Sequence, residues 1–178
     1  MTGDAAELTL ENVGPGPDPL TLAELAVPVE PADPTTTEEA DTAHESILLL
    51  LHRDHHAGQC RRQIRAVADR YDEFRDRGCQ VVSVVPEPRE RVEQWQARYD
   101  LPFPLCADPE ATAGDTFDQP IRLGALGEQF DVVGRMPVAI IFDIDDDGAI
   151  DIATAYRGRT NLDRPDIDEL LATIDRQT

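Results

Sequence analysis

Residues 46–85 read SILLLLHRDHHAGQCRRQIRAVADRYDEFRDRGCQVVSVV, which predicts a strand, a helix and a second strand. Ile47 to Leu51 form a continuous apolar run, as expected for a strand that is buried on both faces. Apolar residues then recur at helical spacing over residues 60–77, which indicates a helix of about five turns. The segment QVVSVV, residues 80–85, predicts the second buried strand.

The flanking sequence extends this pattern in both directions. Residues 7–25, ELTLENVGPGPDPLTLAEL, alternate apolar and polar positions around a turn-rich centre and predict a β-hairpin. After the second buried strand we expect a helix over 89–99, a short strand within 101–109, a strand over 137–144, a turn at 145–148, a strand over 149–156 and a closing helix around 164–177.

Strands that alternate with helices predict a parallel sheet, and the late hairpin adds an antiparallel edge. We therefore expect one three-layer α/β domain over residues 1–178. Its mixed central sheet would be flanked by helices and extended by the N-terminal hairpin. Residues 27–45 contain prolines, threonines and acids without a period, which predicts a solvated acidic connection within this domain.

Charge is the strongest feature of the composition. The chain has 36 acidic and 16 basic residues, a net charge of −20, and every basic residue is Arg. Such a surface repels phosphates, so we expect neither nucleic acid nor membrane as a partner. At about 1 M salt the screening length is roughly 3 Å and self-repulsion largely disappears, which suits a halophilic cytoplasm. A GC-rich genome with an acidic proteome would give the same composition.

The N-terminal sequence MTGDAAELTL lacks the basic and apolar regions of a signal peptide. No apolar run approaches the roughly 20 residues that a membrane helix needs. We therefore expect a soluble, cytoplasmic protein.

The cysteines number three, Cys60, Cys79 and Cys106, and their wide spacing argues against a disulfide framework. The sequence contains no C-x-x-C pair, which removes the ordinary zinc-ribbon and dithiol patterns. Cys79 opens an apolar strand and Cys106 lies within another. Both are expected in the core.

Cys60 has three interpretations. It is a reactive thiol, a buried inert residue in phase with Ile64, or a metal ligand together with His52, His55 and His56. A thiol reacts as its thiolate, and the ordinary thiol pKa of about 8.5 falls to roughly 3.5–7.5 at helix N-termini or beside cations. The predicted place of Cys60, in the first turn of a helix, favours the first interpretation.

Three further segments match a known family in order and spacing. The family has a strand, a loop and a reactive cysteine at a helix start, and these correspond to ILLLLHRDHHAGQCRRQ. Its pattern FP-x-x-x-D corresponds to LPFPLCADPEATAGDTF. Its hairpin pattern P-x-x-F-x-I-D-x-x-G-x-I corresponds to MPVAIIFDIDDDGAI. The chain thus resembles a peroxiredoxin-like redoxin of the alkyl hydroperoxide reductase/thiol-specific antioxidant group, with a degenerate catalytic motif. This group is part of the thioredoxin-fold superfamily, so the resemblance implies that the three-layer α/β domain is thioredoxin-like.

The resemblance implies a thiol-dependent antioxidant oxidoreductase that acts in cell redox homeostasis. Cys60 would be the single peroxidatic cysteine, and a hydroperoxide would be its substrate. Because Cys79 and Cys106 match no resolving position of the family, the reductant would be an external small thiol or a thioredoxin-like protein. No cofactor or metal is implied, and the chain would form a homodimer or remain monomeric.

The positions that would shape the substrate groove depart from the family signature P-x-x-x-T-x-x-C. Arg53 stands at the place of the Pro, and Ala57 at the place of the Thr, whose hydroxyl contacts thiolate and peroxide in the family. Pro137 occupies the place of an active-site Arg and is more similar to the cis-Pro of thioredoxin.

The candidate catalytic partners of Cys60 are therefore displaced from the family positions. Arg135 lies two residues before Pro137, on the same face if that strand extends so far. Arg164 lies one residue from the place of a second family Arg, near the start of the last helix. His56 would contribute charge or proton transfer.

These departures leave a second hypothesis of another class. A thioredoxin-fold protein without efficient catalysis would exchange thiols or bind partners through the surface around Pro137 and the Cys60 loop. The losses at positions 53, 57 and 137 favour this hypothesis, whereas the retained cysteine favours the enzyme.

Overall fold

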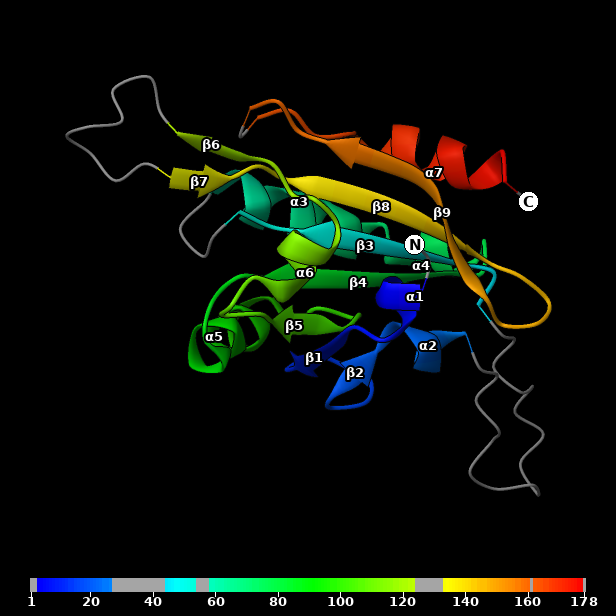
Figure 1. The fold of residues 1–178 in the computed structure, drawn as a ribbon, viewed down its shortest axis with the longest axis horizontal. Coiled ribbons are helices and arrows are strands. Elements are labelled where there is room, and N and C mark those ends of the chain that lie inside the picture. The colour runs from blue at the N-terminus through cyan, green and yellow to red at the C-terminus, as the bar shows by residue number, and fades with distance from the viewer. Residues whose placement is uncertain (1–2, 27–43, 54–57, 124–132, 161, 178) are drawn as a thin grey trace.

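A mixed sheet of seven strands forms the centre of the protein (Figure 1). The computed structural model describes residues 3–26, 44–53, 58–123, 133–160 and 162–177. The strands, in sheet order, are β2 (Leu20–Thr21), β1 (Thr9–Asn12), β5 (Leu105–Ala107), β4 (Cys79–Val85), β3 (Ser46–Leu51), β8 (Val138–Ile144) and β9 (Ile150–Arg157). The predicted connection over 27–45 lies, except for its last two residues, outside the described residues.

The direction of the strands follows the predicted order of elements. β3 runs parallel to β4 and β4 runs parallel to β5, whereas β8 and β9 add an antiparallel edge. The acidic turn at residues 145–148 joins β8 to β9, as predicted. The mixed sheet is therefore confirmed.

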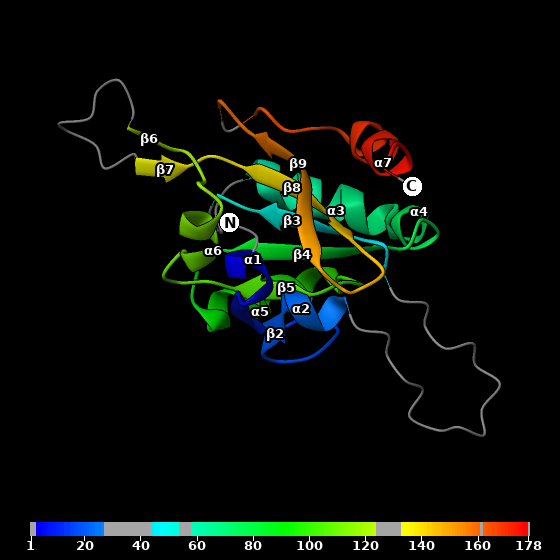
Figure 2. The same cartoon turned by 45° about the vertical axis from the view of Figure 1, so that its right-hand side comes forward.

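Helices cover both faces of this sheet, which gives the expected three layers (Figure 2). One face packs against α3 (Gly58–Asp69), α4 (Tyr71–Arg75), α5 (Arg89–Tyr99) and α7 (Ile167–Asp175). The other face packs against the short helices α1 (Gly3–Ala6), α2 (Leu22–Leu25) and α6 (Thr112–Thr116). A separate pair of strands, β6 (Ile121–Leu123) and β7 (Val133–Arg135), lies beside the main sheet.

The apolar run of β3 contributes to both cores because side chains alternate between the faces of a strand. Leu48 and Leu50 lie in the cluster with α3, and Ile47, Leu49 and Leu51 lie in the opposite cluster. Every residue of β3 is buried. This confirms that a continuous apolar run marks a strand covered on both sides.

The prediction of one helix over residues 60–77 is wrong in its continuity. α3 ends at Asp69 and α4 begins at Tyr71, because Arg70 adopts a φ of −118° and a ψ of 21°, outside the helical region. The apolar positions stay in phase across the break, since Val67 and Phe74 are both fully buried. The helical periodicity of apolar residues therefore did not reveal the break at Arg70.

The N-terminal hairpin is confirmed but is shorter than predicted. Leu10 pairs with Leu20, whereas Leu22 opens a helical turn in place of a longer strand. A capping box between Thr21 and Glu24 begins that turn. The hairpin also joins the main sheet, because β1 pairs with β5.

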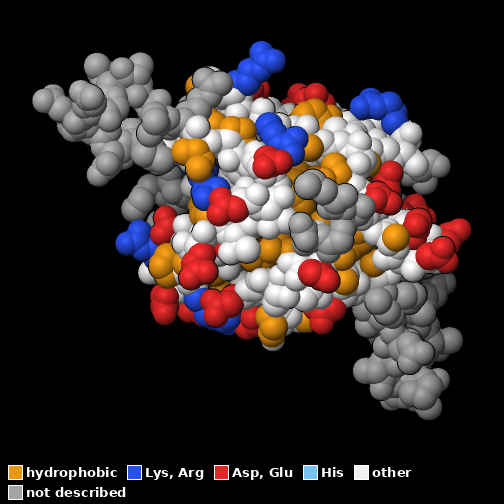
Figure 3. All heavy atoms as spheres, viewed as in Figure 1, with side chains coloured by type: hydrophobic (Ala, Val, Ile, Leu, Met, Phe, Trp, Pro, Cys, Tyr) orange, Lys and Arg blue, Asp and Glu red, His pale blue; other side chains and the backbone are white. Residues whose placement is uncertain are grey.

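The surface has the charge that the composition predicts. Figure 3 shows acidic side chains spread over the visible face, with arginines between them. In the part of the chain that the structure describes, no helix has the length and apolar character needed to cross a membrane.

Candidate active site

Cys60 lies in the first turn of α3, just beyond the end of β3. The helix begins at Gly58, so Cys60 is its third residue. Amide N–H groups at this end of a helix lack partners within the helix, and the helix dipole is positive here. The Cys60 side chain is fully buried beside Ile64 and Val67. The backbone thus places the sulfur where an anion is favoured.

Two N–H donors reach the sulfur of Cys60. Nη2 of Arg164 lies 2.9 Å from Cys60 Sγ, and the backbone N–H of Arg53 donates to the same atom over 3.4 Å. A guanidinium beside sulfur stabilises the thiolate over the thiol through a charge-assisted hydrogen bond. The predicted partner Arg164 is therefore brought to Cys60, whereas Arg53 contributes its backbone.

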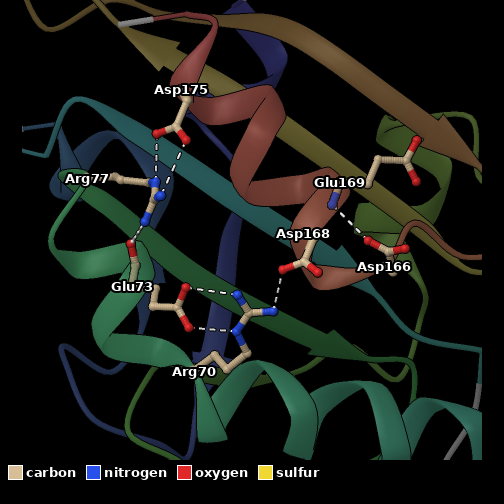
Figure 4. A network of polar contacts seen from close by, with 7 residues as sticks. All are labelled: Arg70, Glu73, Arg77, Asp166, Asp168, Glu169 and Asp175. Carbon is tan, nitrogen blue, oxygen red and sulfur yellow. Dashed lines mark hydrogen bonds and ion pairs between the residues drawn. The ribbon is translucent and has the colours of Figure 1, made fainter.

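Arg164 precedes α7, in a segment that is held at both ends. At one end Gly158 N–H donates to the carbonyl of Pro137 over 2.9 Å. At the other end the carboxylate of Asp166 accepts from Glu169 N–H over 2.8 Å and caps α7. Figure 4 shows this cap beside the ion pairs that join α7 to α4.

Arg70, at the break between α3 and α4, provides one of those ion pairs. Arg70 binds Glu73 through two nitrogens, at 2.6 and 2.8 Å, and reaches Asp168 of α7 with its Nη1 at 2.7 Å (Figure 4). Seven residues further on, Arg77 binds Asp175 at 2.6 Å (Figure 4). These pairs fix α7, and with it the segment that carries Arg164, against α4.

His52 lies at this site, where the sequence interpretation had offered it only as a metal ligand together with Cys60. It follows β3 in phase with Leu48 and Leu50, so its ring points toward the helices that pack against Cys60. The ring is buried and meets the edge of Trp95, with centroids 6.0 Å apart. Burial and, to a smaller degree, the charge of Arg164 lower the pKa of His52 to about 3. The imidazole is therefore neutral at physiological pH.

Gln119, which no sequence pattern marked, ties the end of β3 to the start of β8. Its Nε2 donates to the carbonyl of His52 over 3.3 Å and to the carbonyl of Met136 over 2.8 Å. The side chain is 7 % exposed, so these bonds form away from water. They hold the backbone of His52 in place beneath the site.

Arg53 and Arg135, the two other arginines considered in the sequence analysis, each lie against a glycine. A Cβ added at Gly134 would lie 2.5 Å from Nη2 of Arg53, and one at Gly114 would lie 2.6 Å from Nη1 of Arg135. Both glycines are therefore needed for the close approach of a guanidinium. Arg135 also pairs with Asp115 at 2.9 Å.

Arg135 does not share a strand with Pro137, so the condition under which the two would lie on the same face is not met. β8 begins at Val138, and Arg135 ends β7, where Met136 N–H bonds to the carbonyl of Pro120. Pro137 is buried and its peptide bond is trans, since the cis bond among the described residues is Asp18–Pro19. The likeness of Pro137 to a cis-Pro therefore does not extend to its conformation.

The remaining sequence candidates divide into two groups. His56 and Ala57 lie outside the described residues. Cys79 and Cys106 are core residues, as expected, and burial raises the pKa of Cys79 to about 11 and that of Cys106 to about 12. Among the residues that the structure describes, no three His, Cys, Asp or Glu side chains are grouped to hold a metal ion.

Comparison with known proteins identifies the family of this chain. The profile of the AhpC/TSA family matches residues 23–151. The chain belongs to the AhpC/TSA family. The resemblance inferred from the sequence is confirmed, and membership makes the chain a peroxiredoxin-like, thiol-dependent oxidoreductase.

Solved structures of this family share the fold at low sequence identity. Xanthomonas campestris bacterioferritin comigratory protein superposes with a TM-score of 0.72 at 14% identity, over 98% of this chain and 94% of its own. The peroxidoxin BcpB of Mycobacterium tuberculosis superposes with a TM-score of 0.69 at 15% identity, over 96% of this chain and 93% of its own. Mycobacterium tuberculosis AhpC superposes with a TM-score of 0.62 at 20% identity, over 96% of this chain and 88% of its own. Curated proteins gave no sequence match.

Proposed function

We propose that Cys60 is the peroxidatic cysteine of this chain and reduces hydroperoxides. The observation that carries the proposal is the pair of donors on its sulfur, Arg164 Nη2 at 2.9 Å and Arg53 N–H at 3.4 Å. A buried thiol without a cation would stay protonated and inert, whereas this sulfur has both a charge and a helix terminus beside it. The Xanthomonas relative is a protein with alkyl peroxide reduction activity, which suggests the substrate class.

The proposed reaction begins with attack of the Cys60 thiolate on the distal oxygen of ROOH. The sulfur–oxygen bond forms as the oxygen–oxygen bond breaks, and the electron pair leaves on RO⁻, which becomes ROH with a proton from water. Cys60 is then a sulfenic acid. The cationic Arg164 stabilises the thiolate before attack and the negative charge that develops during it.

An external thiol would return Cys60 to its reduced form. Cys79 and Cys106 are buried and have raised pKa values, so neither provides a resolving thiolate. We propose a thioredoxin-like protein or a small thiol as the reductant. A groove of about 240 Å³ between α3 and the segment before α7 includes Gln59, Arg62 and Arg164 in its lining. Because Cys60 is fully buried, the first turn of α3 must move before that thiol reaches the sulfur.

We further propose that the chain is one domain in the cytoplasm of a salt-rich cell. The net charge of −20 and the use of Arg alone as the basic residue support this setting. A homodimer is a prediction that sedimentation in 0.2 M and 2 M salt would test. Arg135 and His56 stay proposed catalytic partners of Cys60. Ala57, Pro137 and Arg53 stay proposed residues of the substrate groove.

The experiment that tests the proposal is intact-mass analysis after one equivalent of hydrogen peroxide in high salt. We expect addition of one oxygen, trapped at Cys60 by a sulfenic-acid reagent, and no addition in the matched variant Cys60→Ser. Peroxide consumption with dithiothreitol, and then with thioredoxin, would identify the reductant class. A wild-type chain that keeps its mass, with Cys60 reduced, would contradict the proposal and favour the partner-binding hypothesis.

A further inference from the structure

A cavity of about 440 Å³ lies at the end of α3 that is remote from Cys60. α3 ends at Asp69, and the helix places that residue about 14 Å along its axis from Cys60. The lining of the cavity comes from α3, α4, the start of β4 and the segment before β3, and includes His44, Asp69, Tyr71, Asp72, Arg75 and Gln80. The cavity is therefore distinct from the proposed peroxide site.

The most buried polar side chain of this lining is the amide of Gln80, which is 9 % exposed. Its Nε2 donates to the carbonyl of Val81 over 2.8 Å and to the phenol oxygen of Tyr71 over 3.0 Å. These two bonds use both hydrogens of the amide. Because a carbonyl oxygen can only accept, the bond to Val81 also fixes which end of the amide is the nitrogen.

The other end of that amide is an acceptor without a donor. Gln80 Oε1 has no hydrogen-bond partner among the residues that the structure describes, and the oxygen is not sealed from solvent. Since Gln80 is otherwise buried and lines the cavity, we infer that Oε1 faces the cavity. The protein thus holds an oxygen in a fixed orientation where a donor from another molecule can reach it.

The charges around the cavity favour a cation. Asp69 and Asp72 contribute exposed carboxylates, and Asp69 has no ion pair within the described part of the chain. Arg75 contacts Asp72 at 3.5 Å. Arg70, which lies between the two acids in sequence, binds two other acids instead (Figure 4). The C-terminal end of α3 adds the negative potential of the helix dipole.

The dimensions of the cavity suit an organic cation better than a metal ion. Over the described residues, no three His, Cys, Asp or Glu side chains are grouped to hold a metal. A volume of about 440 Å³ lies in the range of sites for small molecules. An alkylammonium group carries a positive charge and three N–H donors. Ala68 and Pro102, also in the lining, provide apolar contact for a carbon chain.

We propose that this cavity binds the ammonium group of a small organic amine. Gln80 Oε1 accepts one of its hydrogen bonds, and the carboxylates of Asp69 and Asp72 supply the complementary charge. The amide gives direction because its nitrogen is held by two bonds. The proposal goes beyond the proposed function and does not depend on the reactivity of Cys60.

The test is a titration of ¹⁵N-labelled protein with butylammonium chloride, followed by NMR at pH 7 in 1 M NaCl. At this salt concentration the general attraction of cations to an acidic surface is screened. The side-chain amide signals of Gln80 and the backbone signals of residues 68–72 should shift and saturate, with a Kd of roughly 1 mM or tighter. Butan-1-ol, which has no charge, and butyrate, which has the opposite charge, should bind at least about tenfold more weakly.

Two variants assign the binding to the cavity. Gln80→Met removes the acceptor at similar volume and should weaken binding by about 10–100-fold, as for a lost hydrogen bond to a charged group. Asp69→Asn removes one exposed carboxylate and should weaken it by about twofold to fivefold. The matched control is Glu110→Gln, an exposed acid beyond β5, which should bind like the wild type. Because Asp69 and Glu110 are exposed, this comparison remains if Gln80→Met fails to fold.

Three results would overturn the proposal. The first is the absence of saturable shifts with butylammonium. The second is equal binding of butan-1-ol, which would make the cavity an apolar site without selectivity for charge. The third is an equal loss of affinity in Asp69→Asn and Glu110→Gln, which would attribute the binding to net charge alone.

Discussion

Nη2 of Arg164 lies 2.9 Å from Sγ of Cys60, although the two residues are 104 positions apart. The contact depends on α7, because Arg164 lies three residues before that helix, and ion pairs join α7 to Arg70 and Arg77 on either side of α4 (Figure 4). We therefore expect the reactivity of the proposed peroxidatic thiol to depend on the packing of the C-terminal helix.

The first prediction concerns the number of reactive thiols. Cys79 and Cys106 are buried and have pKa values raised to about 11 and about 12, so both stay protonated at pH 8. We expect an alkylating reagent to modify one cysteine per native chain at pH 8, and three in denaturant. Peptide mapping should assign the native site to Cys60. Modification of Cys79 or Cys106 before unfolding would contradict the structure.

The second prediction concerns the ion pairs of Arg70. Arg70→Met removes the link from the end of α3 to Asp168, so α7 and Arg164 should be held less firmly. Because the pair is partly exposed, we expect a fall in Tm of only a few degrees and alkylation of Cys60 slowed by about twofold to threefold.

The matched control for Arg70 is Arg75→Met. Arg75 contacts Asp72 at 3.5 Å within its own helix, and both side chains are exposed. This variant should alter neither the melting temperature nor the alkylation rate. Equal effects of the two substitutions would show that the link to α7 has no role in the site.

The third prediction concerns two acids that face each other across β8 and β9. Asp143 pairs with Asp151, and burial together with the charge of Asp151 raises the pKa of Asp143. A raised pKa means that the folded chain binds this proton more tightly, so the ionised carboxylate opposes folding at pH 7. Asp143→Asn should add about 0.2–1 kcal/mol to the free energy of unfolding.

The gain should shrink in 1 M salt, where the charges are screened, and at pH 3, where Asp143 is protonated. Chemical denaturation at each condition measures it. Asp146→Asn, in the exposed turn, changes the net charge equally and serves as the control. An equal gain from Asp146→Asn would attribute the effect to net charge alone.

The fourth prediction concerns acid stability. The pKa of His52 is about 3 in the folded chain and 6.5 without the fold. Between these values the unfolded chain binds more protons, so the stability contributed by neutral His52 is full above pH 6.5 and is lost as the pH falls. The free energy of unfolding of His52→Phe should therefore fall less from pH 7 to pH 4. The largest slope difference is about 1.4 kcal/mol per pH unit. Identical pH profiles of the two chains would show that the pKa of His52 does not change on folding.

Much of the fold follows from local pattern. Continuous apolar runs predicted the buried strands β3, β4 and β8. The spacing of Ile64 and Val67 predicted the start of α3 beside Cys60. These signals are strong because burial on both faces of a sheet requires apolar residues at every position. The break in the helix at Arg70 was not predicted, because the helical spacing of the apolar residues continues across it.

The site was predicted less completely, since its contacts join distant segments. Arg164 was named through its place before the last helix, but its contact with Cys60 depends on tertiary packing. Gln119 carried no signal at all, because a single glutamine near a turn has no distinctive pattern. The phase of Leu48 and Leu50 would have placed His52 on the face of Cys60, had it been extended by one step beyond the strand.

The most direct test of the account is the second-order rate constant for oxidation of Cys60 by hydrogen peroxide at pH 7, compared between the wild type and Arg164→Met. Arg159→Gln, an exposed arginine of the same segment, is the control. A hydrogen bond to a charged group is worth about 1.5–3 kcal/mol, so Arg164→Met should react about 10–100 times more slowly, and Arg159→Gln like the wild type. A wild-type rate no greater than that of Arg164→Met would contradict the claim that this guanidinium activates the thiol.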